Sequence, residues 1–130
     1  MGTQTTDTIT KAEQALTVMD SRAQHVRAVS LQLLGEHAAG LPELMAVRVE
    51  ASSSRQQLAL QPYTVQDARQ WAAALDVTLT VSIEDAVPAG WRAVHARANL
   101  EIEGVQVHLG SYQTYSPEQW AEHTAAVVAA

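Results

Sequence analysis

The chain has 130 residues, no cysteine and a formal net charge of −6, with 47% hydrophobic and 17% charged residues. This length corresponds to one domain, and the composition is that of a globular rather than a disordered protein. The absence of cysteine excludes disulfides and thiolate chemistry. Eight cationic against fourteen acidic residues argue against broad binding to a phosphate backbone.

Residues 1–9 are predicted to be a disordered segment ahead of a single domain over residues 10–130. The N-terminus has neither the basic nor the apolar region of a signal peptide. No apolar run approaches the roughly 20 residues that cross a bilayer. We therefore expect a cytoplasmic protein without membrane contact. Lysine occurs only at Lys11, while arginine and alanine are common. This composition resembles that of short Ala-, Val- and Arg-rich proteins of actinobacteria and their phages, a resemblance that implies no activity.

The first predicted element is a long helix from Thr10 to Gly40. Thr10 and Glu13 have the spacing of a capping box, and Pro42 cannot continue a helix. The helix is about twice the average length, so it must cross the whole domain or pack against another chain. Its apolar residues recur close to a 3.6-residue period: Ala12, Ala15, Met19, Val26, Val29 and Leu33.

A short hairpin is predicted next. Residues 47–50 and 58–61 alternate apolar and polar side chains. This period of two is typical of strands with one buried and one solvated face. Ser52–Ser54 is predicted to form the turn between them.

A second helix and a third strand follow. The helix is predicted to begin at Thr64, which with Asp67 resembles a capping box. Residues 77–84 again alternate, which indicates a strand. Residues 86–90 contain proline and glycine and are predicted to form a loop.

The strongest local pattern is a hairpin from Trp91 to Tyr112. Glu103 and Gly104 can form a two-residue turn, which sets the register of the strands on either side. A one-residue slip would mix the two faces, so the register is well specified. One face then carries the apolar pairs Ile102–Val105, Leu100–Val107 and Ala98–Leu109. The other carries Glu101–Gln106, Asn99–His108, Arg97–Gly110 and His95–Tyr112.

The last helix is predicted to begin at Ser116, with Pro117 in its first position and Gln119 completing a capping box. The element order is then α-β-β-α-β-β-β-α. Each strand has one apolar face that must be covered. We therefore predict an α+β fold, an antiparallel sheet of about five strands with three helices packed mainly on one face.

Residues 48–75 and 97–124 align without gaps. A duplicated ββα unit would explain this similarity and would imply a domain with pseudo-twofold symmetry. Against it, the helix caps Thr64 and Ser116 differ by three positions in the alignment. The matches are Arg48 with Arg97, Gln57 with Gln106, Leu60 with Leu109, Tyr63 with Tyr112, and Gln70-Trp71-Ala72 with Gln119-Trp120-Ala121.

Motifs for catalysis, metal binding and nucleotide binding are absent from the sequence. The five histidines show no metal-ligand spacing, the serines lie in no G-x-S-x-G elbow, and the six glycines form no phosphate loop. The sequence therefore indicates no catalytic residue, no metal and no cofactor, and it favours a protein that is not an enzyme.

The polar face of the long hairpin is the candidate binding face. Hydrogen-bonding and aromatic groups on a rigid sheet can bind a peptide, a small ligand or a single-stranded nucleic acid. The alternative is an ordinary solvated sheet face, or one that the first helix covers. The candidate residues are Trp91, Arg92, His95, Arg97, Asn99, His108 and Tyr112.

Three hypotheses for function follow. The first is a cytoplasmic, non-enzymatic protein-interaction or adaptor module that contacts a protein partner or a second copy of itself as a homodimer. The second is a small-ligand binder or enzyme with a cavity between sheet and helices, which a cavity lined by histidine or arginine would support. The third is a nucleic-acid-associated protein of a phage or mobile element, which the acidic balance disfavours.

Overall fold

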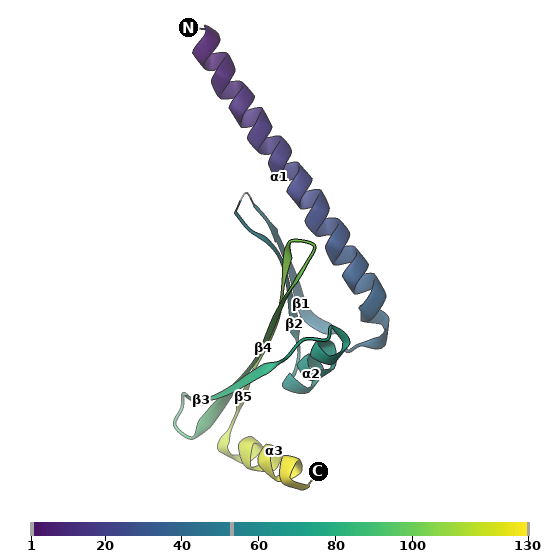
Figure 1. The fold of residues 1–130 in the computed structure, drawn as a ribbon. Coiled ribbons are helices and arrows are strands. Elements are labelled where there is room, and N and C mark those ends of the chain that lie inside the picture. The colour runs from purple at the N-terminus through teal and green to yellow at the C-terminus, as the bar shows by residue number, and fades with distance from the viewer. Residues whose placement is uncertain (1, 53, 130) are drawn as a thin grey trace.

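A computed structural model describes residues 2–52 and 54–129. The predicted α+β class and the order α-β-β-α-β-β-β-α are confirmed (Figure 1). The elements are α1 (Gly2–His37), a 3-10 turn (Ala38–Gly40), β1 (Leu44–Ala51), β2 (Gln56–Pro62), α2 (Val65–Ala74), β3 (Thr80–Ala86), β4 (Trp91–Ile102), β5 (Val105–Tyr115) and α3 (Pro117–Ala129).

The five strands form one sheet in the order β1-β2-β5-β4-β3. Three neighbouring pairs are antiparallel, but β2 and β5 are parallel. The prediction of an antiparallel sheet is therefore corrected at this pair. The physical reason is the connection through α2, which carries the chain from β2 past β5 and β4 to the edge strand β3. The two hairpins meet through their second strands, which run in the same direction.

The register predicted for the hairpin β4–β5 is confirmed at all seven pairs, from Ile102 with Val105 to His95 with Tyr112. Glu103 and Gly104 have φ angles of 49° and 83°. Positive φ at both central residues is what a type I′ turn requires, and this turn matches the twist of the strands. The side chains of the hairpin are therefore divided between two faces as the alternation predicted.

The apolar face of the sheet is covered by the helices, as predicted. Val26, Val29 and Leu33 of α1 pack in one cluster with Trp71 of α2 and the inner side chains of β2, β4 and β5. Trp71 is 1% exposed, and its Nε1 donates a hydrogen bond of 2.9 Å to the carbonyl oxygen of Pro42. This bond ties α2 to the segment that links α1 to the sheet.

The helix starts at Thr64 and Ser116 are confirmed. Thr64 Oγ1 accepts a 3.0 Å bond from the backbone N–H of Asp67. At α3, Ser116 Oγ accepts from the Gln119 N–H at 3.2 Å, and Gln119 Oε1 accepts from the Ser116 N–H at 2.9 Å. In the predicted turn Ser52–Ser54, Ser53 lies outside the described residues.

The first helix is longer than predicted. It begins at Gly2 rather than at Thr10, and it runs through residues 2–9, which the prediction had assigned to a disordered segment. Neither proline nor glycine occurs between Gly2 and Gly35, so the capping pattern at Thr10 lies inside a sequence that nothing interrupts. Within the described residues, no helix is long and apolar enough to cross a membrane.

The topology argues against a duplicated ββα unit. Leu60 and Leu109, which the alignment equates, lie side by side on parallel strands with both side chains buried on the helix side. Yet β1 lies on one side of β2, and β4 lies on the opposite side of β5. The two hairpins are thus related as mirror images, and no rotation superposes mirror images. The pseudo-twofold symmetry that a duplication would imply is not observed in the described residues.

We predict opposite effects for two glycine substitutions. Gly104→Ala should destabilise the protein by about 1 kcal/mol, because an L side chain at a φ of 83° is strained. Gly35→Ala should stabilise it by about 0.5–1 kcal/mol, because Gly35 lies in α1 and an added Cβ would meet nothing within 4 Å. Urea unfolding measures both. Unchanged or higher stability of Gly104→Ala would contradict the turn geometry, and a loss of stability in Gly35→Ala would contradict the open space around that helix position.

Candidate functional site

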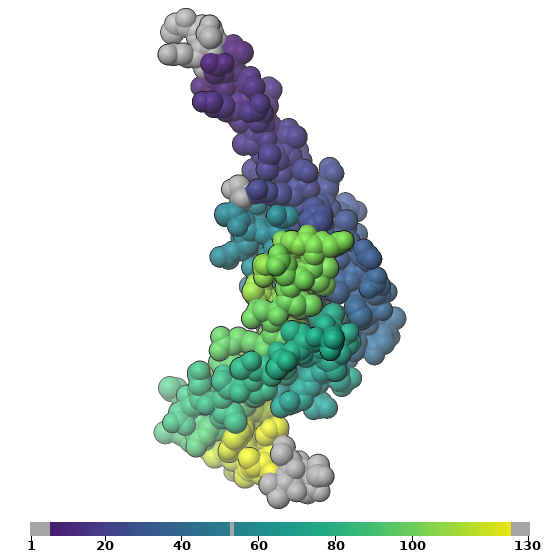
Figure 2. Space-filling model, viewed as in Figure 1, coloured from purple at the N-terminus to yellow at the C-terminus, as the bar shows by residue number. Residues whose placement is uncertain are grey.

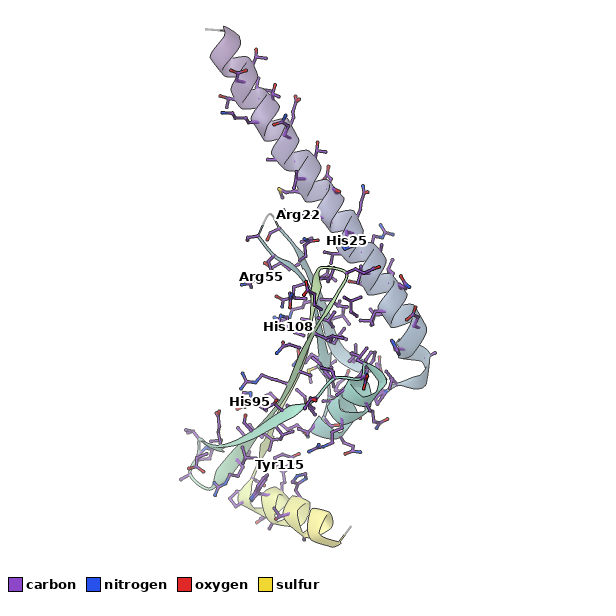
Figure 3. All side chains as sticks on the ribbon, in the orientation of Figure 1. Arg22, His25, Arg55, His95, His108 and Tyr115 are labelled. Carbon is purple, nitrogen blue, oxygen red and sulfur yellow. The ribbon has the colours of Figure 1, made fainter. Side chains whose placement is uncertain are left out.

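The face of the sheet opposite the helices is open. His95 and His108 lie on the side of the sheet away from α1 and α2 (Figure 3). The alternative that the first helix covers this face is therefore excluded. We call this surface the open face.

The open face is hollowed where its side chains are smallest. Ala59 of β2 and Gly110 of β5 lie in the floor of a depression of about 340 Å³. Arg48 is paired with Ala59, Ala59 with His108, and His108 with Asn99, so one row of the depression crosses four strands. Larger side chains at the two floor positions would fill the hollow.

The depression is lined by cationic and neutral groups. Arg48, Arg97, His95 and His108 line it, and none of its lining residues is an aspartate or glutamate. Arg48 and Arg97 are exposed, and their side chains form no hydrogen bond or ion pair with any residue that the structure describes. In a chain with a net charge of −6, this is a local site suited to an anionic group.

Neighbouring side chains hold both histidines in place. His108 Nδ1 is hydrogen-bonded to Asn99 Oδ1. Because a carbonyl oxygen only accepts, Nδ1 is the donor in this hydrogen bond. His95 packs edge-on against Tyr112, with ring centroids 4.5 Å apart and an interplanar angle of 71°. The depression therefore has preformed walls.

Five of the seven predicted residues come together at the depression: His95, Arg97, Asn99, His108 and Tyr112. Trp91 begins β4, four residues before His95, and lies outside it. Arg92 is excluded, because it pairs across the strands with Tyr115 and Asp85 and its Nη1 lies 2.9 Å from Asp85 Oδ1. Strand alternation places its side chain on the helix side of the sheet.

The sequence prediction missed the contribution of the first hairpin. Arg48, Gln57 and Gln61 complete the lining of the depression. Their alternation with Val47, Leu58 and Leu60 did place them on a polar face. Which strand of that hairpin would adjoin β5 was not readable from the sequence.

Among the described residues, the depression holds no aliphatic hydroxyl with a base beside it, and no metal-ligand cluster is found. Ser111, the one hydroxyl-bearing aliphatic residue in the lining, is buried, and its Oγ has no hydrogen-bond partner, so no base activates it. Residues 2–52 and 54–129 hold no group of three or more histidine, aspartate or glutamate side chains that could share a metal ion.

Comparison of the chain with protein-family models, with curated proteins and with solved structures found no match. The assignment of function therefore depends on the residues and geometry of this chain.

We predict that Arg97→Glu leaves the melting temperature within about 3 °C of the unmodified protein, because Arg97 is exposed and unpaired among the described residues. The matched control is Ala98→Glu, the same charge on the next residue. Ala98 is 3% exposed on the helix side, so this variant should lose several kcal/mol, roughly 3 or more. Thermal unfolding by circular dichroism measures both. Equal destabilisation would contradict the assignment of the two faces.

Proposed function

We propose that the chain is a non-enzymatic interaction module that self-associates through the N-terminal half of α1. The observation that carries the proposal is an apolar stripe on a part of this helix that the rest of the chain leaves uncovered. The open face would then remain available to a further partner.

The N-terminal half of α1 stands clear of the sheet (Figures 1 and 2). Every residue from Thr6 to Ser21 is exposed. Beyond this projecting half, α1 contacts the turn between β1 and β2 and the turn between β4 and β5. Arg22 Nη1 donates to the Ser52 carbonyl oxygen at 3.5 Å, and a ring nitrogen of His25 lies 2.6 Å from the Glu103 carbonyl oxygen. Since α1 has 36 residues, it is about 54 Å long, and more than a third of it projects.

A seven-residue repeat runs through both halves of α1. The spacing of three and four residues continues through Val26, Ser30 and Leu33, which are buried against the sheet. Ile9, Leu16 and Met19 of the projecting half are 52%, 58% and 42% exposed. The repeat comprises Ile9, Ala12, Leu16, Met19, Ala23, Val26, Ser30 and Leu33.

The apolar stripe winds around the axis of α1 as it runs toward the N-terminus. In a straight helix a seven-residue repeat drifts by about 20° per heptad. Between Leu33 and Ala12, three heptads apart, the stripe therefore rotates by roughly 60°. The projecting part of the stripe thus points in a direction roughly 60° from that of Leu33, and its large side chains Ile9, Leu16 and Met19 are exposed.

The projecting half needs support to remain helical. It contains six threonines between residues 3 and 17, and β-branched residues are weak helix formers. An isolated helix of this length is marginal in water even with good helix formers. Packing of an apolar stripe is what stabilises such a helix, and an occupant on this stripe would supply it.

We infer that a second copy of the chain covers this stripe, with its helix α1 antiparallel to the first. Antiparallel pairing places the large Leu16 of one copy opposite the small Ala12 of the other, and Met19 opposite Ile9. Parallel pairing would place Ala12 opposite Ala12 and leave a gap. Antiparallel pairing also keeps the two bodies at opposite ends, so Val26 and Leu33 stay packed on their own sheet.

We predict a weak, concentration-dependent dimer. Covering the remaining exposed surface of Ile9, Leu16 and Met19 in both copies favours the dimer, and the loss of translational and rotational freedom on association opposes it. Leu16→Glu should abolish the dimer in light scattering and reduce the helix content of α1 in circular dichroism. Gln14→Glu is the matched control, because position 14 lies on the opposite side of the helix. A monomer at millimolar concentration, or equal disruption by the control, would contradict self-association.

A second candidate function is the binding of anions at the open face. Single-stranded nucleic acid is the macromolecular anion that we consider. It is favoured by two arginine side chains that are unpaired among the described residues, beside two histidines, with no carboxylate among the described residues that line the depression. We predict that a short single-stranded oligonucleotide binds at low salt with steep salt dependence, and that Arg97→Glu abolishes this binding. Arg69→Glu, the same charge change on helix α2, should not. If a fluorescence polarisation titration detects no oligonucleotide binding at low salt, nucleic-acid binding at the open face is excluded.

A further inference from the structure

A second cavity lies on the helix side of the sheet, between α2, α3 and strands β3–β5, and has a volume of about 550 Å³. Its walls are predominantly apolar. Val65 of α2, Val81 and Ile83 of β3, Val94 of β4 and Trp120 of α3 line it. This volume is within the range of sites that bind small molecules.

The cavity exists because the core beneath it is built from small side chains. Val65, Ala68, Val94 and Ala96 form this core, and the chain contains no phenylalanine. As a result Ile83 remains 57% exposed at the mouth of the cavity. Apolar surface left in contact with water is unfavourable, so an apolar occupant would be stabilised here.

Aromatic rings wall the cavity on the side of α3. Tyr115 has its ring centroid 5.7 Å from that of Trp120 and 4.9 Å from that of His123. The Tyr115 hydroxyl donates to Gln113 Oε1 at 3.1 Å, and the same oxygen accepts from the Val65 N–H at 2.8 Å. Burial raises the pKa of Tyr115, so the phenol stays protonated and keeps donating. Rings held in this way favour a flat ligand.

One cation stands at the rim. Arg69 of α2 is exposed, and its side chain forms no hydrogen bond or ion pair with another residue in the described part of the chain. It is the only arginine or lysine among the lining residues, and no lining residue is an aspartate or glutamate. A single guanidinium at the mouth of an apolar cavity matches a ligand with one carboxylate.

We propose that this cavity binds an aromatic monocarboxylate of one or two rings. The ring packs against Trp120, Tyr115 and the valines, and the carboxylate lies at Arg69. The proposal is independent of self-association through α1, because none of the cavity-lining residues lies on that helix.

The test compares naphthoate with naphthamide, a neutral compound of nearly the same shape, on the 130-residue chain. Each is titrated while the indole N–H signal of Trp120 is followed by NMR, with the signal assigned through Trp120→Phe. Naphthoate should shift this signal saturably and bind about fivefold more tightly than naphthamide, because the charged contact at the rim is partly screened by water. The buried Trp71 signal should not move.

Three variants locate the site. Arg69→Gln should remove the preference for naphthoate and leave naphthamide binding unchanged, whereas Arg55→Gln, at an exposed arginine between β1 and β2, should change neither. Ile83→Trp should fill the mouth of the cavity and weaken both compounds at least fivefold, and its exposed position makes it compatible with folding. The proposal is overturned if neither compound shifts the Trp120 signal, if both bind equally to the unmodified protein, or if decanoate binds more tightly than naphthoate.

Discussion

The register of the hairpin β4–β5 is the constraint on which the rest of this structure depends. The type I′ turn at Glu103 and Gly104 sets it. Every alternate residue of two long strands then points to the same side. Valine, leucine and alanine side chains face the helices, while histidine, arginine and asparagine face solvent. A slip by one residue would place Arg97 in the core and Leu109 in water. The core and the open face are thus two consequences of one turn.

The parallel pairing of β2 with β5 adds the second hairpin to this frame. It brings Arg48 and Ala59 beside His108, so the depression of the open face draws on four strands rather than two. The same pairing gives the two hairpins opposite hands, which removes the symmetry that the repeated sequence suggested. The similarity between residues 48–75 and 97–124 therefore reflects similar local demands: a hairpin with one apolar face, followed by a capped helix.

Two apolar regions of this fold are left uncovered by the chain itself. The projecting half of α1 exposes Ile9, Leu16 and Met19, and the small side chains under α2 and α3 leave a cavity. The first is an elongated stripe that suits another helix. The second is a concave apolar space with a cation at its rim, which suits a small acid. The open face differs from both, because it is polar and cationic.

The sequence by itself determined the local elements of this protein. Alternation located the strands, the Glu103-Gly104 turn specified seven residue pairs, and the capping residues Thr64 and Ser116 marked two helix starts. These features depend on neighbours within a few residues, or on one tight turn, so they are encoded locally. The same alternation assigned His95, Arg97, Asn99, His108 and Tyr112 to one face, and all five line the depression.

Only the tertiary structure decided how these elements meet. The side of β5 on which β2 docks depends on the path of the chain through α2, and no residue pattern records that choice. Arg48, Gln57 and Gln61 were therefore missed as site residues. Arg92 was grouped with the candidate face because it is close to His95 in the sequence, but it lies three residues away, and this odd spacing places it on the other face, beside Asp85. The volume left under α2 and α3 depends on how side chains from three strands and two helices fill a shared space. Such a volume is a property of the packing between elements, and a linear sequence specifies the elements more directly than the space between them.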